Sequence, residues 1–252
     1  MPLIYSHFYA IIHSRGDNMI NYAHRGASEY APENTLSSFY LGLLQGANGI
    51  ETDVQKTKDG VLVLFHDDTL DRVSNKQGKL CDYTWDELKD IEIYGSCTTG
   101  FYDRMVTLKE FLEKFSQYDI NFAIELKGAD VEKETLEMVK AFGIMNKTTF
   151  TSFKFQYIEK IKQLDKTARI GWLVFSVNNE AIEQLLGIGG EEIAPEAELF
   201  SGELMKKCRN AGLGVRAWGV SNIALMKKMC ALGVDGMTVN FPDRLREYLH
   251  IL

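Results

Sequence analysis

The sequence has few cysteines and prolines and no long apolar run. Its 252 residues include four cysteines and four prolines. The cysteines, Cys81, Cys97, Cys208 and Cys230, have no CxxC spacing. This argues against a zinc site or a disulfide framework, and it favours reduced thiols in a cytoplasmic protein. No apolar run approaches the roughly 18 residues that a membrane-spanning helix needs, so we expect no stable insertion into a membrane.

Positive charge is also scarce. Lys and Arg number 28 against 35 Asp and Glu, which gives a net charge of −7. A polynucleotide partner is therefore not expected, because its phosphate backbone would need a basic stripe to follow. The chain also lacks glycine-rich turns of the GxGxxG or GxxxxGK[ST] kind after its predicted strands, which weakens a doubly wound nucleotide-binding sheet. The 45% hydrophobic and 25% charged content is typical of an ordinary globular chain.

The first 18 residues differ from the rest. The stretch Leu3–Ile12 is apolar and aromatic, but no basic segment precedes it and no small-residue cleavage site follows, so it is a poor signal peptide. Met19 opens a run that looks like a complete domain start. We therefore predict that residues 1–18 are an N-terminal extension and that residues 19–252 form the functional domain.

From Ile20 onward, short β-type segments alternate with helical segments. Eight such units over residues 19–252 give about 29 residues per unit, which is typical of a (β/α)8 TIM barrel in the α/β class; an open doubly wound sheet is the alternative. The predicted strands are Asn21–His24, Gly49–Gln55, Phe122–Leu126, Thr148–Phe153, Arg169–Val174, Ala197–Phe200, Gly214–Trp218 and Gly236–Asn240. The predicted helices include Thr35–Gln45, Val131–Phe142, Phe155–Leu164, Gly202–Ala211 and Ser221–Leu232.

One interval interrupts this alternation. Between His66 and a helix that starts near Leu108 lie about 40 residues with no clean βα unit, and long excursions in compact domains are often functional. Within this interval, Thr84-Trp85-Asp86-Glu87 has the pattern of a capping box, which predicts a short helix through about Ile91. In a barrel this excursion would lie near a strand end and could cover a site.

Carboxylates occupy the predicted strands. Glu51 and Asp53 are two residues apart in an apolar strand, so both point to one face, and Glu125 lies in a strand that is otherwise almost wholly apolar. Burying like charges is costly unless a cation compensates them. Oxygen donors without cysteine suit Mg²⁺ or Ca²⁺. If the pair instead faced solvent, Ile50 and Val54 would have to form the core face alone.

A hairpin places a histidine beside this set. Asp59-Gly60 is a preferred two-residue type I′ turn, so Lys58 would pair with Val61 and Asp53 would lie opposite His66. Cross-strand partners share a face, with Cβ atoms about 5 Å apart. A longer loop would shift this register.

Further charged and titratable groups lie at the same predicted end. Two of the five histidines, His24 and His66, fall beside the strand carboxylates and could serve as a general acid/base couple near neutral pH. Arg25 and Lys127 add fixed positive charge, as a phosphate anion requires. Together these groups indicate metal-assisted displacement at phosphorus.

In their order along the chain, these motifs resemble the glycerophosphodiester phosphodiesterase family of the phospholipase-C-like phosphodiesterase barrels. The resemblance spans Met19 to the C-terminus. It is carried by Ala23-His24-Arg25-Gly26-Ala27, Pro32-Glu33-Asn34-Thr35, Glu51-Thr52-Asp53-Val54, Lys58-Asp59-Gly60, Leu64-Phe65-His66-Asp67, Ile124-Glu125-Leu126-Lys127, Val215–Val220 and Gly233-Val234-Asp235-Gly236.

The resemblance implies a TIM barrel with a small insertion after the second strand, here about residues 68–107, which shapes the glycerol end of the site. It implies metal-dependent hydrolysis of glycerophosphodiesters, such as glycerophosphocholine or glycerophosphoethanolamine, to glycerol 3-phosphate and an alcohol. One Mg²⁺ or Ca²⁺ ion would be the cofactor and a small phosphodiester the partner, in a monomer or homodimer. The implied residues are His24 and His66 as the acid/base pair, Arg25 and Lys127 on phosphate, Trp218 lining the cleft, and Glu51, Asp53 and Glu125 as metal ligands.

Two segments depart from the family pattern. Trp218-Gly219-Val220-Ser221 stands where Trp-Thr-Val-Asn is common, and Val239-Asn240-Phe241-Pro242 where Thr-Asp-x-Pro is common. We expect neither to touch the metal or histidine set. Lysophospholipase-D-like or other lipid diester cleavage is the main alternative, for which Phe101, Tyr102 and Met105 could supply an apolar patch. A barrel that only binds phosphodiesters is a third.

Overall fold

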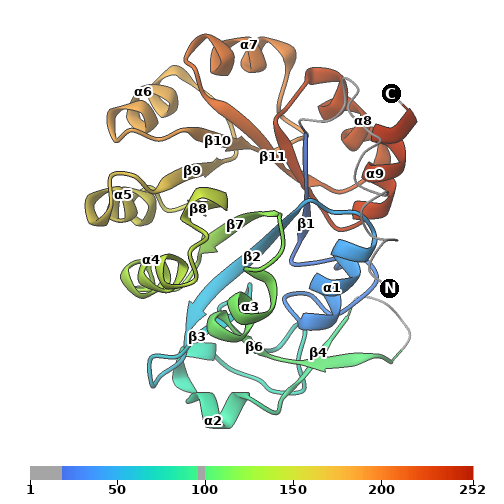
Figure 1. The fold of residues 1–252 in the computed structure, drawn as a ribbon, viewed down its shortest axis with the longest axis vertical. Coiled ribbons are helices and arrows are strands. Elements are labelled where there is room, and N and C mark those ends of the chain that lie inside the picture. The colour runs from blue at the N-terminus through green and yellow to red at the C-terminus, as the bar shows by residue number, and fades with distance from the viewer. Residues whose placement is uncertain (1–18, 96–99, 252) are drawn as a thin grey trace, which may run out of the picture.

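Parallel strands close into a ring in the computed structural model, which describes residues 19–95 and 100–251. The barrel strands are β1 (Ile20–His24), β2 (Gly49–Lys56), β7 (Asn121–Leu126), β8 (Thr148–Ser152), β9 (Arg169–Val174), β10 (Glu192–Pro195), β11 (Gly214–Val220) and β12 (Gly236–Val239). Within the described ranges these eight strands pair in that order, all parallel, and β12 pairs back onto β1. The predicted (β/α)8 barrel is confirmed (Figure 1).

Helices surround this barrel on the outside (Figure 1). They are α1 (Leu36–Leu44), α3 (Leu108–Phe115), α4 (Glu132–Ala141), α5 (Phe155–Leu164), α6 (Asn179–Gly187), α7 (Gly202–Asn210), α8 (Ile223–Leu232) and α9 (Pro242–Ile251). Buried apolar side chains such as Ile50, Ile124, Ile170 and Val215 form one core with the inner helix faces. Burying each such side chain contributes about 1.5–3 kcal/mol. Among the described residues, no helix is long and apolar enough to cross a membrane.

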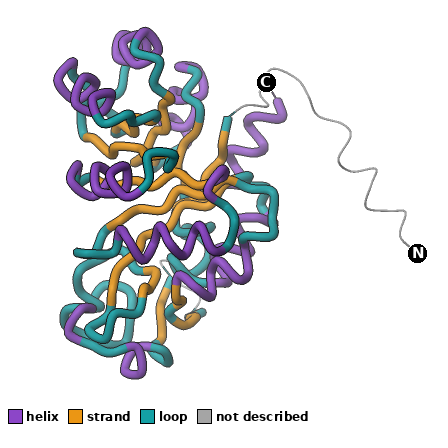
Figure 2. The backbone as a smooth tube through the Cα atoms, turned by 60° about the vertical axis from the view of Figure 1, so that its left-hand side comes forward, coloured by secondary structure: helices purple, strands orange, loops and turns teal. Residues whose placement is uncertain are grey.

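The segment between β2 and α3 forms a layer of its own at one end of the molecule, mostly loop (Figure 2). Its elements are β3 (Leu62–Leu64), a 3₁₀ turn (Leu80–Asp82), α2 (Trp85–Leu88), β4 (Glu92–Tyr94), β5 (Tyr102–Arg104) and β6 (Val106–Thr107). Thr84 and Glu87 cap α2 reciprocally, as their spacing predicts. A second apolar cluster that includes Phe65, Leu80 and Met105 holds the segment together.

Two predictions, one about the start of the chain and one about this segment, stay predictions. The extension over residues 1–18 lies outside the described residues, as does Cys97. The insertion limits at about 68–107 remain a prediction of where the family barrel is interrupted. A second 3₁₀ turn (Met145–Lys147) precedes β8.

The predicted strand at Ala197–Phe200 is wrong. The sixth barrel strand is β10, five residues upstream, and Glu196 makes an isolated bridge to Trp218. Burial explains the error, because Ala197 and Phe200 pack into the core from the loop before α7 and so imitate a strand pattern. The true strand carries Glu192, whose carboxylate turns inward to an ion pair with the buried Arg216.

The predicted hairpin register is also wrong by one residue. Val54 pairs with Leu64, and the Asp53 carbonyl accepts a hydrogen bond from the Phe65 amide at 3.0 Å. Residues 58–60 form a three-residue loop in which Gly60 has a φ of +89° and Asp59 does not have a positive φ, whereas a type I′ turn needs positive φ at both central residues. Asp59 instead accepts hydrogen bonds through its carboxylate, from the Thr57 hydroxyl at 2.6 Å and from a backbone amide on α2 at 2.9 Å.

Candidate active site

Three carboxylates meet inside the barrel. Glu51 and Asp53 point inward from β2, and Glu125 lies on β7 directly beside Asp53 in the strand register. One oxygen of each carboxylate lies within 4.8 Å of the others, and all three side chains are buried. Successive side chains of a strand point to opposite faces. Glu51 and Asp53 therefore point into the barrel, while Ile50 and Val54 pack on the other face toward the helices.

The donor set fits a hard divalent cation. Asp53 Oδ2 lies 3.1 Å from Arg25 Nε and accepts a hydrogen bond from Asn34 Nδ2 at 2.9 Å. Asp53 Oδ1 is buried and has no hydrogen-bond partner among the described residues. A buried carboxylate oxygen without a partner is costly, and an ion held by Glu51, Asp53 and Glu125 would satisfy it with the oxygen ligands that Mg²⁺ and Ca²⁺ prefer.

The three carboxyl groups differ in proton affinity. Burial raises the pKa of Glu51 well above its usual value, and the charges of Asp53 and Glu125 raise it further. Burial and then Asp53 raise the pKa of Glu125 to about 7, partly opposed by Lys127, whose Nζ lies 3.3 Å away. Burial alone would raise the pKa of Asp53 as well, but the adjacent Arg25 guanidinium brings it below its usual range.

The raised pKa of Glu125 makes stability depend on pH when no metal is bound. Between the ordinary value of 4.5 and about 7 the folded protein keeps a proton that the unfolded chain releases, so stability falls as pH rises. The Glu125→Gln variant lacks this titrating group and therefore does not lose that stability. The difference in free energy of unfolding, variant minus parent, should increase by up to about 3 kcal/mol from pH 4.5 to pH 8. Urea denaturation in EDTA measures this difference, and a value that stays constant over the range would contradict it.

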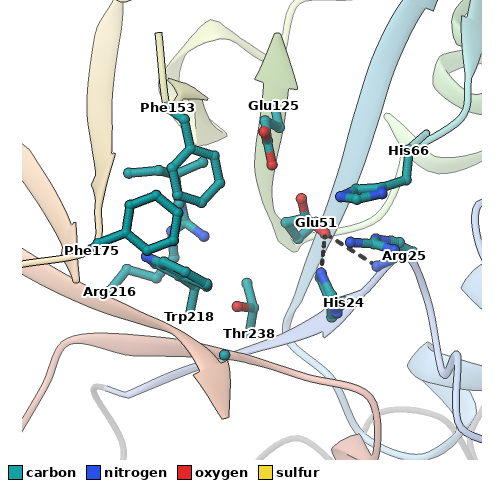
Figure 3. A pocket seen from close by; sticks show the side chains of 12 residues that line it. His24, Arg25, Glu51, His66, Glu125, Phe153, Phe175, Arg216, Trp218 and Thr238 are labelled. Carbon is teal, nitrogen blue, oxygen red and sulfur yellow. Dashed lines mark hydrogen bonds and ion pairs between the residues drawn. The ribbon is translucent and has the colours of Figure 1, made fainter. Parts of the chain in front are cut away.

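His24 lies at the end of β1 and is oriented by the loop after β12. Its Nδ1 is 2.6 Å from Asn240 Oδ1, and its Nε2 is 3.8 Å from Glu51 Oε2 (Figure 3). Because an amide oxygen only accepts hydrogen bonds, Nδ1 carries the proton and Nε2 presents its lone pair. Burial, and then the charge of Arg25, lower the pKa of His24 to about 4. The imidazole is therefore neutral at pH 7 and able to accept a proton.

This contact corrects one expectation about the departures from the family pattern. Asn240, which stands where aspartate is common, touches the histidine set directly. The other departure has a local reason, since Gly219 adopts a φ of +70° at a bulge of β11, a conformation that side chains with a Cβ rarely adopt. Gly219 also lines the cavity beside Trp218.

His66 follows β3 and is held by its neighbours. Its Nδ1 lies 2.5 Å from Asp67 Oδ1. Gln55 Nε2 donates to the carbonyls of Phe65 and Asp67 at 3.2 and 2.6 Å, which fixes the backbone on both sides of the histidine. In Figure 3 the ring extends toward Glu51 from the same side of the site as Arg25. His66 thus reaches the carboxylates even though it is not the cross-strand partner of Asp53.

Arg72 lies outside the sequence motifs and links two of them, the one that contains Asp67 and the one that contains Glu33. Its guanidinium binds both oxygens of Asp67 and both oxygens of Glu33 at 2.5–3.1 Å. Glu33 also accepts a hydrogen bond from Arg25 Nη1 at 3.0 Å. Burial alone would raise the pKa of Asp67, but hydrogen bonds from Arg72 and His66 lower it to about 2. This network ties the segment after β3 to the loop before α1.

Arg72→Met should therefore lower kcat by about tenfold, because a displaced Asp67 leaves His66 less well positioned. Arg72→Lys should lose less, since it keeps one charged contact. Steady-state kinetics at saturating metal measure the effect. Lys89→Met, which removes an exposed ion pair to Asp86 on α2, is the matched control. Equal kcat values for Arg72→Met and the parent protein would show that the network does not position the histidine.

The loop after β1 adopts an unusual backbone that brings two motifs together. Arg25 and Asn34 have φ values of +55° and +57°. Gly26 has a φ of +84°, and a Cβ there would lie 2.4 Å from Ser38 atoms on α1. Asn34 donates to Asp53 and accepts a hydrogen bond from the Thr52 hydroxyl at 2.7 Å. Through Asn34, the loop between β1 and α1 thus holds Asp53 and its neighbour Thr52 in place on β2.

A cavity of about 300 Å³ opens over these groups. Arg25 lines it, whereas Lys127 pairs with Glu125 and is not among the lining residues. Trp218 lines the opposite side, as the resemblance implies, together with three residues that the sequence reasoning missed: Phe153, Phe175 and Arg216 (Figure 3). A signal existed for each of the three. The two phenylalanines follow barrel strands directly. Arg216 is a charged residue inside a strand, between Val215 and Ala217 on β11, just as Glu51 is a charged residue inside β2.

Known proteins share this fold. The chain aligns with a phosphodiesterase from Oleispira antarctica in complex with the product sn-glycerol-3-phosphate, with a TM-score of 0.82, 27% identity, and coverage of 91% of this chain and 96% of that one. It aligns with a glycerophosphodiester phosphodiesterase from Agrobacterium tumefaciens with a TM-score of 0.78, 26% identity, and coverage of 90% and 99%.

Sequence comparison gives the same result. The chain is 31% identical to a glycerophosphodiester phosphodiesterase of Caldanaerobacter subterraneus subsp. tengcongensis, over 88% of this chain and 94% of the relative. It is 32% identical to one of Bacillus altitudinis, over 88% and 95%. The model of the glycerophosphoryl diester phosphodiesterase family matches residues 24–244. The chain therefore belongs to the glycerophosphoryl diester phosphodiesterase family and is an enzyme of that class.

Proposed function

We propose that this enzyme hydrolyses glycerophosphodiesters, such as glycerophosphocholine or glycerophosphoethanolamine, to glycerol 3-phosphate and an alcohol with one Mg²⁺ or Ca²⁺ ion. The observation that carries the proposal is one cavity in which two histidines, an arginine and buried carboxylates face each other. The product complex of the Oleispira antarctica phosphodiesterase supports the same product class here. A cytoplasmic location and a monomeric or homodimeric state stay predictions.

Glu51, Asp53 and Glu125 would hold the ion. When bound, a divalent ion stabilises negative charge on the phosphate and increases the acidity of a neighbouring hydroxyl. The three carboxylates are then ionised, because the cation offsets the burial and mutual repulsion that raise the pKa of Glu51 and Glu125 in its absence. Arg25 and Lys127 add positive charge toward the substrate phosphate.

The histidines move the protons. His24 Nε2, with Nδ1 held by Asn240, accepts the proton of the attacking hydroxyl. His66, with Nδ1 held by Asp67, donates a proton from Nε2 to the departing alcohol. The attacking hydroxyl is the one adjacent to the phosphate on glycerol, which forms a cyclic phosphate and releases the alcohol. In the second step, water opens the cyclic phosphate. His66 accepts a proton from the attacking water, and His24 returns a proton to the glycerol oxygen that leaves the phosphorus.

A substrate without the adjacent hydroxyl tests this pathway. The phosphocholine ester of 1,3-propanediol keeps the phosphodiester and the choline but lacks the nucleophile. Phosphorus NMR should show a transient cyclic phosphate from glycerophosphocholine and no hydrolysis of the propanediol ester. Equal rates for the two esters would show that water attacks the phosphorus directly.

Lipid diesters are the second substrate class to compare. Phe101 and Tyr102 are about half exposed, which would suit contact with an acyl chain, but Met105 is fully buried and adds nothing to the expected patch. We therefore expect glycerophosphocholine to be cleaved with a higher kcat/KM than lysophosphatidylcholine. The reverse order would assign the enzyme to lysophospholipase-D-like chemistry on the same catalytic groups.

A further inference from the structure

One side of the cavity is built from apolar side chains at the ends of neighbouring strands. We call it the aromatic wall and define it as Phe153 after β8, Leu173 on β9, Phe175 after β9, and Trp218 on β11. It lies opposite His24, Glu51 and His66 (Figure 3). A diester whose phosphate sits at the carboxylates therefore has one of its two ester groups against this wall.

The three rings of the wall touch each other and form a corner. Their centroids are 5.0–5.3 Å apart, and the planes of Phe153 and Phe175 differ by 31°. Both planes are nearly perpendicular to that of Trp218, at 84° and 81°. A group in this corner would lie within about 6 Å of all three centroids, the range in which ring faces attract a cation. Phe175 is 63% exposed, so its ring is accessible to a ligand.

The side chains of the wall offer no free hydrogen-bonding group to a ligand. Its only polar side-chain atom, Trp218 Nε1, already donates to the Val174 carbonyl at 3.1 Å. A glycerol or inositol group there would lose hydrogen bonds to water without replacement, and so would a primary ammonium. A quaternary ammonium has no N–H group and loses none. The glycerol end, with its two hydroxyls, suits the opposite side, where histidine and charged side chains line the cavity.

One positive charge lies near the wall but is neutralised inside the barrel. Arg216 lines the cavity and is fully buried. Its Nε lies 2.9 Å from Glu192 Oε1, and its guanidinium lies over the Tyr22 ring at 5.4 Å from the centroid. The ion pair offsets the repulsion that Arg216 would exert on a cation at the wall.

We propose that the aromatic wall binds the quaternary ammonium group of the alcohol, so that choline esters are the preferred glycerophosphodiesters. The inference rests on the proposed function and narrows its substrate class. An acyl chain is the competing occupant, but three rings at a corner of a cavity of about 300 Å³ suit a compact cation better than an extended chain. The wall residues are then specificity-determining residues.

A neutral isostere separates cation binding from shape. The 3,3-dimethylbutyl ester of glycerol 3-phosphate has the size of glycerophosphocholine with carbon in place of nitrogen. We expect the parent enzyme to cleave the choline ester with a kcat/KM about fivefold or more above that of the isostere. Phe175→Leu, which keeps an apolar side chain without a ring, should reduce that ratio at least twofold. Phe101→Leu, at an exposed phenylalanine that does not line the cavity, should leave the ratio unchanged.

Binding of choline alone gives a readout that does not depend on turnover. Choline should quench tryptophan fluorescence through Trp218 at lower concentration than 3,3-dimethylbutanol, and Phe175→Leu should weaken that quenching. Equal kcat/KM values for the two esters together with equal quenching would overturn the inference, even with an active enzyme. Selective quenching by choline without hydrolysis of any glycerophosphodiester would support the wall as a cation site and contradict the proposed function instead.

Discussion

His66→Ala should lower kcat by at least about 10²-fold, within the range that acid/base groups contribute. His66 is anchored by Asp67 through Nδ1, and its ring extends toward the carboxylates. Without it, the departing alcohol leaves as an alkoxide. The loss should appear in kcat more than in KM, because the proton moves only as the reaction proceeds. Stopped assays of glycerol 3-phosphate release measure both constants.

A matched histidine shows whether this loss is specific. His250→Ala alters an exposed histidine on α9 that does not line the cavity, and it should leave kcat unchanged. Because the His66 side chain is 29% exposed, its removal should lower the melting temperature only slightly. Near-normal turnover by folded His66→Ala would exclude this residue as the acid.

Asp53→Asn should have an effect of comparable size for a different reason. The carboxylate is fully buried, with one oxygen at Arg25 and Asn34 and the other without a partner among the described residues. The amide cannot supply the charge that a divalent ion needs. Even changes to the outer partners of a metal site cost about 10–100-fold, so we expect kcat/KM to fall more than about 100-fold at a metal concentration that saturates the parent enzyme.

Direct metal binding identifies the cause of that loss. Calorimetric titration with Mg²⁺ and with Ca²⁺ should show weaker binding to Asp53→Asn, and higher metal should partly restore activity. Asp86→Asn, at an exposed position on α2, is the control and should bind metal normally. Unchanged metal affinity in Asp53→Asn would remove this residue from the ligand set.

The barrel could be predicted because each unit repeats the same local pattern. A short apolar strand, a turn and an amphipathic helix recur at a nearly constant spacing, and this spacing favours parallel closure. The prediction failed at β10, where the strand is four residues long and contains both Glu192 and Pro195. Those residues look unsuited to a strand until the buried partner of Glu192, Arg216 on β11, is known.

The site could be located from the sequence because its groups lie on or directly after strands. Alternation placed Glu51 and Asp53 on one face, and strand order brought Glu125 beside them. The contacts made between distant segments could not be predicted. Asn240 is 216 residues from His24, and Arg72 joins motifs whose separation in space depends on the fold of the segment after β3.

Release of glycerol 3-phosphate from glycerophosphocholine, in EDTA and then with Mg²⁺ or Ca²⁺ restored, tests the central claim most directly. The three buried carboxylates, and the Asp53 oxygen that no described residue satisfies, predict no release in EDTA and recovery with one of the two ions. The ion that restores more activity at equal concentration identifies the cofactor. Full activity in EDTA, or no release with either ion from folded protein, would contradict metal-dependent glycerophosphodiester hydrolysis.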